Sequence, residues 1–411
     1  MSSTDAFADG HDRRTLGAMA ASRGLRGAVV RTREELEALA QRWLGLEDIA
    51  SGTTLFQSLG WARSVYDFEA ARGNAAFDPV VVTIEDGRRL VGVLPLERIR
   101  TGTRSLLVPL GHAFAQISDV LLAPGFDPAA AVGQLLRTAS AAAPSDCFSF
   151  LKVRDGSALA QGMPKTHLRT GETQGAPYVA FEAFPDFAAY FSTVRAKTRK
   201  NMRNARNRLE REGALEHRVV ADPKEQLALI ERTLGGRADR LREQGLTSRA
   251  FRDGGFVDFC KDLVGRADLE LLAFSLTHLD RPLAEQWGFV HGGRYYAFVA
   301  SRDFSHSDES PGKLHLREIL QTCAERGLVG CDLGVPAMPY KLTFATETIG
   351  VADYALPLTP QGWLVIQSWD MWLRPNLKRL ILAMPAGLRT RLMRLVGHGN
   401  QTAEATQDPV S

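Results

Sequence analysis

Short apolar runs separated by turn residues dominate the chain between residues 269 and 341. Between two of these runs, His291-Gly292-Gly293 supplies the glycines that a tight hairpin turn requires. The order of the runs predicts three strands, a helix and a further strand, followed by a polar tip with Tyr340 and Lys341. The expected strands are Leu269–Thr277, Leu283–Val290, Arg294–Arg302 and Val329–Leu333, and the expected helix runs from Ser310 to about Arg326.

The same order of elements occurs earlier in the chain, although the residues differ. Asp86-Gly87 marks a hairpin turn, and after two shorter apolar runs come an alanine-rich helical stretch at Asp127–Ala142 and a strand-like run at Cys147–Val153. This echo predicts an α/β (α+β) protein of two tandem lobes, each a mixed, mostly antiparallel sheet flanked by helices. The expected divisions are a disordered lead (1–27), an N-terminal lobe (28–178), a C-terminal lobe (179–358), C-terminal helices (359–398) and a disordered tail (399–411).

The composition is that of an ordinary globular protein long enough for two domains. Of 411 residues, 45% are hydrophobic and 24% are charged, and the net charge is +3, which argues against a general nucleic-acid coat. No long uncharged apolar run is present, so no membrane span is expected. The cysteines show no Cys-x-x-Cys spacing, which predicts buried free thiols, a cytoplasmic location and no metal site. They are Cys147, Cys260, Cys323 and Cys331.

The most unusual stretch is a basic helical run at 195–211, in which Glu210 is the single acid. Several of its arginines share one arc of the helix, beside an apolar stripe through which the helix can dock. Three interpretations stand: a solvated basic face, a site for a phosphate of a substrate or cofactor, and an RNA-facing helix. The lack of interleaved aromatic residues weighs against RNA, so we favour the anion site. The candidate substrate ligands on this arc are Arg195, Arg199 and Arg203.

A second candidate anion site is the start of the helix predicted from Ser310. Pro311 suits the first helical position, Gly312 lets a ligand approach the backbone, and Lys313 and Leu314 complete the first turn. Free N–H groups and the positive end of the helix dipole favour a phosphate here. The alternative is an ordinary helix start capped by the serine side chain.

The order of several short motifs resembles that of the CelD/BcsL-type acyltransferases, a branch of the GNAT acyl-CoA superfamily related to the Fem-type peptidoglycan aminoacyltransferases. The resemblance extends from near residue 55 to near residue 355, and it implies two GNAT-like lobes and an acyl-CoA co-substrate. The start of the predicted helix at Ser310 departs from the usual Gln/Arg-x-x-Gly-x-Gly/Ala pyrophosphate loop of the superfamily. The matching residues are Phe56-Gln57 with Trp61, the basic run 195–211, Pro282-Leu283-Ala284, Trp287-Gly288-Phe289, Gly292-Gly293-Arg294-Tyr295-Tyr296, Asp303, Ser310-Pro311-Gly312, Gly327, Asp332-Leu333-Gly334 and Tyr340-Lys341.

Acyl transfer from a thioester requires a polarised carbonyl, a base for the acceptor and a proton for the thiolate. Lys341 is the candidate for stabilising the oxyanion, as the Fem-type resemblance implies, and Tyr340 is the candidate proton donor. Asp332 is the candidate base or the partner that holds Lys341, and Glu285 and Asp303 are rival bases. Trp287 packs either the acceptor or the core. No Gly-x-Ser-x-Gly nucleophile motif is present, so direct transfer is expected.

The resemblance therefore implies an acyl-CoA-dependent N- or O-acyltransferase, with acetyl as the expected group and a sugar, polysaccharide or cell-envelope precursor as acceptor. Exopolysaccharide or cellulose biosynthesis is the expected context. The alternatives are a tRNA-dependent aminoacyltransferase of Fem type and a non-catalytic binding protein of exopolysaccharide synthesis. Past residue 359, an aromatic stripe predicts core packing or a homodimer seam, with peripheral membrane contact as the alternative. It consists of Trp363, Ile366, Trp369, Trp372 and Leu373.

Overall fold

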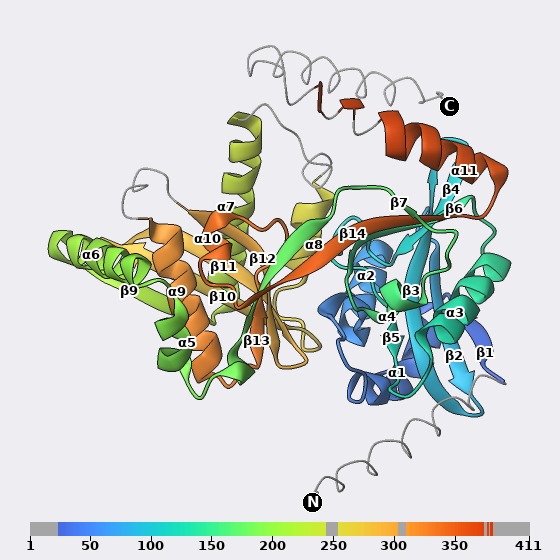
Figure 1. Ribbon diagram of the computed structural model, residues 1–411, viewed down its shortest axis with the longest axis horizontal. Helices are drawn as coiled ribbons and strands as arrows, with labels where there is room; N and C mark the ends of the chain where they lie inside the picture. Colours follow the sequence, from blue (N-terminus) through green and yellow to red (C-terminus); the bar gives the residue numbers. More distant parts are fainter. Residues whose placement is uncertain (1–23, 244–253, 303–309, 374–375, 378, 381–411) are drawn as a thin grey trace, which may run out of the picture. The chain divides into compact units, whose positions relative to one another are not determined.

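The computed structural model describes residues 24–243, 254–302, 310–373, 376–377 and 379–380 (Figure 1). The chain divides into two compact units. The first contains the residues up to Thr170 together with Ala352–Leu364, and the second contains Gly171–Val351 and the residues from Val365 onward. The prediction of a mixed α/β fold with mostly antiparallel pairing is confirmed.

The first unit is built on the strand order β1-β2-β3-β4-β6, in which only the β4–β6 pair is parallel. A capping box formed by Thr32 and Glu35 begins α1, and Asp127 caps α3 by accepting from the N–H of Ala130. The elements are β1 (Arg26–Val30), α1 (Arg33–Glu47), a 3₁₀ turn (Leu55–Gln57), α2 (Leu59–Ala71), β2 (Pro79–Asp86), β3 (Arg89–Thr101), β4 (Arg104–Pro109), β5 (Leu121–Leu122), α3 (Pro128–Ala142), β6 (Cys147–Arg154), α4 (Ala158–Gly162) and β7 (Leu168–Arg169).

The second unit contains the strand order β14-β8-β13-β12-β11-β10-β9, in which only β12 and β13 run parallel. The expected hairpin turn is confirmed, since Gly292 and Gly293 adopt φ of 54° and 70°. The elements are β8 (Gln174–Ala180), a 3₁₀ turn (Phe181–Ala183), α5 (Phe187–Thr193), α6 (Ala196–Glu212), β9 (Leu215–Val220), α7 (Pro223–Glu243), α8 (Gly255–Asp262), β10 (Glu270–His278), β11 (Arg281–His291), β12 (Arg294–Arg302), α9 (Pro311–Glu325), β13 (Gly330–Asp332), α10 (Pro339–Leu342) and β14 (Glu347–Pro357), whose end belongs to the first unit.

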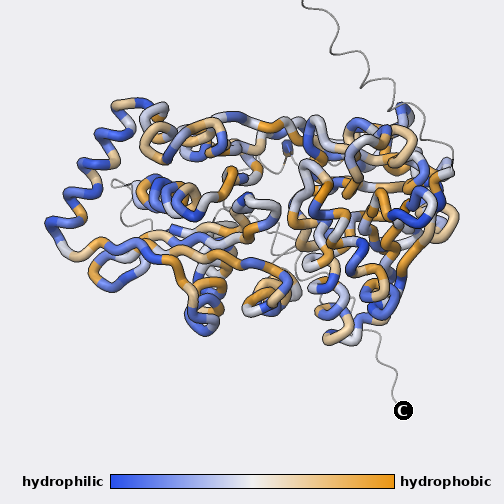
Figure 2. Tube along the Cα trace, turned by 90° about the horizontal axis from the view of Figure 1, so that it is seen from below, coloured by the Kyte–Doolittle hydropathy of each residue, from blue (hydrophilic) through white to orange (hydrophobic). Residues whose placement is uncertain are grey.

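The helices of the second unit cover the two faces of its sheet separately. On one face, α7 packs against β11 and β12 and also contacts α8. On the other face, α9 packs against β10 to β13, and α5 and α6 contact α9 from outside. The core between α9 and the sheet includes Leu316, Ile319 and Tyr295, and α6 adds Met202 and Leu209 to it. Apart from these apolar residues, α6 is hydrophilic along most of its length (Figure 2).

The C-terminal part of the described chain exposes aromatic residues. The helix α11 (Pro360–Val365) continues into a π-helical segment at Ile366–Leu373. Trp363 and Trp372 are 52% and 67% exposed, so core packing of the aromatic stripe is not observed, although Ile366 is buried. Residues 381–398 of the predicted C-terminal helices lie outside the described residues. All four cysteines are buried and free, as expected.

Candidate functional site

The sheet of the second unit splits between β12 and β13. These strands pair only where Arg294–Tyr296 lies beside Gly330–Asp332. Beyond Tyr296, β12 continues to Arg302, and within the described residues its only strand partner there is β11. Beyond Tyr296 the two strands therefore part at the end of β13. We call this place the strand fork.

A β-bulge in β12 lies next to the strand fork. Trp287 of β11 stands opposite Val299 and Gly288 opposite Ala297, so that Phe298 is the extra residue. A bulge bends its strand and interrupts the regular ladder of hydrogen bonds. A Cβ atom at position 288 would lie 2.0 Å from the backbone oxygen of Tyr296, so only glycine permits this close approach. The local shape of the fork therefore depends on Gly288.

The helix α9 begins just past the far end of β12. Ser310 adopts a left-handed conformation with φ of 49°, and its side chain makes no capping hydrogen bond. Its carbonyl instead accepts from the N–H of Lys313 at 2.8 Å and of Leu314 at 3.3 Å. Pro311 occupies the start of the helix as predicted, whereas the expected serine cap is not formed. The serine hydroxyl therefore does not occupy the head of this helix.

A cavity of about 430 Å³ opens between the head of α9 and one side of α6, and we call it the helix-head cavity. Among the described residues, its charged lining consists of Lys313 of α9 and of Arg208 and Arg211 of α6, without a carboxylate. Such a positive cavity at a helix N-terminus suits a phosphate group. Its lining is completed by Thr198, Asn201, Met202, Asn204, Ala205 and Ser310.

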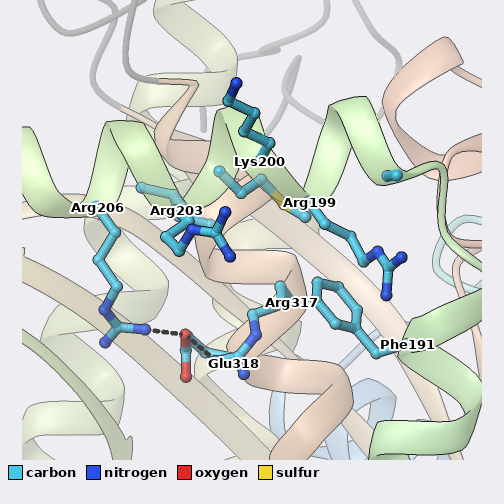
Figure 3. A pocket seen from close by; sticks show the side chains of 10 residues that line it. Phe191, Arg199, Lys200, Arg203, Arg206, Arg317 and Glu318 are labelled. Carbon is cyan, nitrogen blue, oxygen red and sulfur yellow. Dashed lines mark hydrogen bonds and ion pairs between the residues drawn. The ribbon is translucent and has the colours of Figure 1, made fainter.

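A second cavity, of about 660 Å³, lies on another side of α6, and we call it the arginine cavity. Helix α6 supplies arginines one turn apart, α9 supplies Arg317 and Glu318, and α5 supplies an aromatic wall (Figure 3). Met202 lines both cavities. The lining residues are Phe191, Ala196, Arg199, Lys200, Met202, Arg203, Arg206, Leu314, Arg317 and Glu318.

The charges of the arginine cavity are only partly paired. The Oε1 atom of Glu318 accepts from both Arg206 and Arg317, each at 2.6 Å. Burial alone would lower the pKa of Arg206, but its hydrogen bonds to Glu210 and Glu318 raise it above the usual value. The guanidinium of Arg317 also lies over the Phe191 ring, 5.4 Å from its centroid.

Two other arginines of this cavity have no such partner. Arg199 and Arg203 form no ion pair with any described residue. Their side chains extend below α6 toward α9, whereas the amine of Lys200 points away from the other labelled side chains (Figure 3). Two uncompensated guanidiniums therefore reach into a cavity that also has apolar walls.

The predicted catalytic residues Asp332 and Lys341 meet at one backbone position. The Oδ1 atom of buried Asp332 accepts from the N–H of Gly334 at 2.8 Å, and the Nζ atom of Lys341 donates to the carbonyl of Gly334 at 3.0 Å. Lys341 and Tyr340 belong to the short helix α10 and are half-buried. Asp332 and Lys341 are thus both bonded to the backbone of Gly334, just after the end of β13.

The side chains of Glu285 and Trp287 lie on the α7 face of the sheet. Glu285 is 5% exposed and accepts two hydrogen bonds from Arg232 of α7, at 2.6 and 3.1 Å. Trp287 is fully buried, and its Nε1 donates to Thr233 of α7 at 3.0 Å. The side chains that line the two cavities come from helices on the α9 face. The roles of Glu285 as a base and of Trp287 as an acceptor contact stay predictions; in the structure Glu285 pairs with Arg232 and Trp287 packs in the core.

The remaining predicted residues fall in different places. Arg195 is exposed at the start of α6 and lines neither cavity, whereas Arg199 and Arg203 line the arginine cavity. Ser310 and Lys313 line the helix-head cavity, Leu314 lines the arginine cavity, and Gly312 adjoins Arg302 at the end of β12. Asp303 lies outside the described residues.

A comparison with family profiles finds one match, which lies within this unit. Residues 196–342, from the start of α6 to the end of α10, match the profile described as "Acetyltransferase (GNAT) domain". This segment is similar to GNAT-type acetyltransferase domains, and we call it the GNAT domain. The GNAT domain contains every residue of the helix-head cavity, the strand fork and the Asp332–Lys341 cluster. A search of curated protein sequences returns no significant match.

The fold of the chain as a whole is similar to solved structures. FemX matches with a TM-score of 0.56 and 11% identity, over 80% of this chain and 98% of its own. A conserved protein of unknown function from Bacteroides thetaiotaomicron matches with a TM-score of 0.52 and 11% identity, over 80% of this chain and 100% of its own. At this identity the likeness concerns the fold alone. No helix among the described residues is long and apolar enough to cross a membrane.

The GNAT domain also contains a buried histidine, His315, next to a half-buried one, His217. The rings of His217 in β9 and His315 in α9 lie 5.5 Å apart between centroids. Burial, and then the neighbouring His217, hold the pKa of His315 well below its usual value. Burial also lowers the pKa of His217, against an opposing effect of Glu318. Both imidazoles are therefore held neutral in the folded GNAT domain at neutral pH. Within the described residues, no group of three His, Cys, Asp or Glu side chains could hold a metal ion.

Sequence reasoning missed several of the residues that line these sites. Arg208 and Arg211 were counted in the basic run, but the helical arc chosen for ligand binding excluded them. Phe191 and Arg317 gave no signal, because a lone aromatic residue and a lone arginine occur on most helices. The bulge at Phe298 had one trace in the sequence, the glycine at position 288 within an apolar strand.

Proposed function

We propose that the GNAT domain transfers an acyl group, with acetyl as the first candidate, from acyl-CoA directly to a hydroxyl or amine. The observation that carries the proposal is the helix-head cavity. It joins the uncapped start of α9 to Lys313, Arg208 and Arg211, and none of its described lining residues is a carboxylate. Phosphates of the donor fit such a site, because the helix dipole and the cations both favour negative charge.

This arrangement also explains how the domain manages without the usual pyrophosphate loop. In that loop, backbone N–H groups and a basic side chain come from one segment. Here, two of the cations come from α6, which lies about a hundred residues earlier in the chain. The donor's phosphates would therefore be held between two helices, and its thioester would extend along the edge of β12 toward the end of β13.

The residues at the end of β13 suit the reaction. The acceptor's oxygen or nitrogen forms a bond to the thioester carbon, the C–S bond breaks, and the acceptor's proton must leave. Lys341 can stabilise the oxyanion, since its ammonium is a hydrogen-bond donor held at the end of β13 by the Gly334 carbonyl. Asp332 is the base that we assign, and Tyr340 is the donor of a proton to the departing thiolate.

Binding of the donor is the direct test. Isothermal titration with CoA and acetyl-CoA should give binding to the wild-type protein, and Arg208→Gln with Lys313→Gln should weaken it by about tenfold or more. Mass spectrometry of a mixture of candidate acceptors with acetyl-CoA then identifies the acylated product. Absence of CoA binding across acetyl- and longer acyl-CoAs would refute the donor assignment and favour a non-catalytic binding protein.

A second candidate is aminoacyl transfer from a charged tRNA. Two observations favour it: the fold is similar to FemX, and α6 exposes basic side chains such as Arg195, Lys197 and Lys200. Salt-sensitive binding of tRNA together with no binding of CoA would select this candidate over the first.

The acceptor that we propose is a sugar, polysaccharide or cell-envelope precursor, as the resemblance to CelD/BcsL-type acyltransferases implies. Cytoplasmic use of an acyl-CoA donor and a role in exopolysaccharide or cellulose synthesis follow from the same resemblance. Acylation of such a glycan by the purified protein is the observation that tests this part.

A further inference from the structure

The arginine cavity has more charge than the donor requires. We propose that it is a second anion site, which binds the phosphate or diphosphate group of a compound other than the donor. Its role in holding the acceptor rests on the proposed acyl transfer, whereas its capacity to bind phosphate does not. The helix-head cavity provides the donor's phosphates with three cations of its own, Arg208, Arg211 and Lys313.

The pairing of charges inside the cavity indicates what it binds. Glu318 accounts for Arg206 and Arg317, to which it is bonded at 2.6 Å each. Arg199 and Arg203 have no carboxylate partner among the described residues. They are one helical turn apart, so their guanidiniums extend from the same side of α6. A ligand that pairs with both must carry about two negative charges close together.

That requirement selects phosphate chemistry. A carboxylate carries one charge and neutralises one guanidinium, whereas a phosphate monoester carries close to two charges at neutral pH and a diphosphate carries more. The planar guanidinium also matches two phosphate oxygens at once, which strengthens each contact. A phosphate lying between Arg199 and Arg203 would use both forks.

The rest of the lining describes the body of the ligand. Phe191, Met202 and Leu314 give the cavity apolar walls, and Phe191 stacks on Phe187 with centroids 5.6 Å apart. The volume of about 660 Å³ lies in the range of pockets that enclose a whole small molecule rather than a single ion. The ligand class is therefore a phosphorylated compound with an apolar portion next to its phosphate.

The position of the cavity separates it from the donor. Both cavities flank α6, and Met202 is the one residue that lines both. Arg199, Arg203 and Arg206 line only the arginine cavity, and Arg208, Arg211 and Lys313 line only the helix-head cavity. Two sets of substitutions on one helix can thus address the two sites independently.

The test uses inorganic pyrophosphate as the probe and titrates the full-length protein that is already saturated with CoA. Wild-type protein should bind pyrophosphate under these conditions, and the double variant Arg199→Gln/Arg203→Gln should bind it at least about tenfold more weakly. The matched control Arg208→Gln/Lys313→Gln, assayed without CoA, should retain pyrophosphate affinity at the arginine cavity within about threefold. The variant Arg199→Lys/Arg203→Lys keeps both charges but loses the planar guanidinium groups. Its affinity for pyrophosphate should fall between those of the wild type and of Arg199→Gln/Arg203→Gln.

Three outcomes would overturn the proposal. The first is no binding of pyrophosphate by the CoA-saturated wild-type protein. The second is unchanged binding by Arg199→Gln/Arg203→Gln, with thermal unfolding showing that the variant is folded. The third is a loss of CoA affinity in that variant that disappears with dephospho-CoA, which would assign the cavity to the donor's 3′-phosphate. If CoA fails to bind any form but pyrophosphate binding still depends on Arg199 and Arg203, the proposed donor is wrong and this site stands.

Discussion

Arg206 on α6 and Glu318 on α9 form an ion pair of 2.6 Å, and Glu318 is the one carboxylate among the described residues that line the arginine cavity. The same carboxylate also bonds Arg317, so a single acid neutralises part of each helix. The pair connects α6 to α9 beside the cavity. It therefore influences both the stability of the GNAT domain and the charge presented to a ligand.

Replacing Glu318 with glutamine should change stability and anion binding in opposite directions. Loss of two hydrogen bonds between charged groups should lower the free energy of unfolding by about 1–2 kcal/mol, because the side chain of Glu318 is only 14% exposed. The released charges of Arg206 and Arg317 should strengthen pyrophosphate binding several-fold. Urea unfolding and calorimetric titration measure the two effects. Weaker pyrophosphate binding by a folded Glu318→Gln protein would contradict this account of the cavity.

Gly288→Ala should destabilise the protein by about 2–3 kcal/mol. The added methyl group would meet the backbone oxygen of Tyr296 at 2.0 Å, and backbone in a central strand cannot move aside without breaking the ladder. Thermal unfolding measures the loss. Gly235→Ala in α7 is the matched control, because its methyl group meets no atom within 4 Å and a helical glycine replaced by alanine gains up to about 1 kcal/mol. Equal stability of the two variants would show that the bulge tolerates a side chain.

Lys341→Ala should reduce turnover by about 10²-fold or more while leaving CoA affinity within about twofold, since the proposed lysine acts on the oxyanion and not on the phosphates. Steady-state rates with acetyl-CoA and a responsive acceptor measure this. Lys313→Ala is the comparison, because it should instead weaken CoA binding. Turnover of Lys341→Ala equal to that of the wild type would remove this residue from the mechanism.

Glu285→Gln should lower stability by about 1–3 kcal/mol but keep turnover within about twofold. The carboxylate is buried against the α7 face, and its hydrogen bonds to Arg232 would be weakened by the loss of charge. Asp332→Asn at the end of β13 is the contrasting variant, and its turnover should fall by about 10²-fold or more. A large loss of turnover in Glu285→Gln, with normal unfolding, would instead support Glu285 as the base.

The stability of the protein should fall as the pH drops below about 6.5. His217 and His315 have pKa values lowered by burial in the folded state, so below the unfolded value the unfolded chain binds more protons. Their contribution is complete above pH 6.5 and is lost as the pH falls, by up to about 1.4 kcal/mol per histidine and pH unit. Urea unfolding at pH 7.5 and 5.5 should show a smaller difference for His315→Leu than for the wild type. An equal difference would mean that other groups cause the acid sensitivity.

The sequence alone determined the order of the elements and the surfaces that they present. Alternation and glycine turns place β10, β11 and β12 close to their observed bounds, because side-chain direction in a strand follows a period of two. The arginines of α6 and the start of α9 were likewise visible as local patterns. Alternation also predicts the face of the sheet to which each strand residue points, and it places Glu285 and Ala284 on opposite faces.

Only the tertiary structure decided which of these charges share a cavity. Arg208 of α6 lines the same cavity as Lys313 of α9, and Arg203 lines the same cavity as Arg317, because α6 packs on α9 through Met202 and Leu209. Local periodicity contains no information on the angle at which two helices cross or on the partner that a buried carboxylate will choose. Those follow from the packing of residues far apart in the chain, and the packing determines that Glu318 pairs with Arg206 and leaves Arg199 and Arg203 for a ligand.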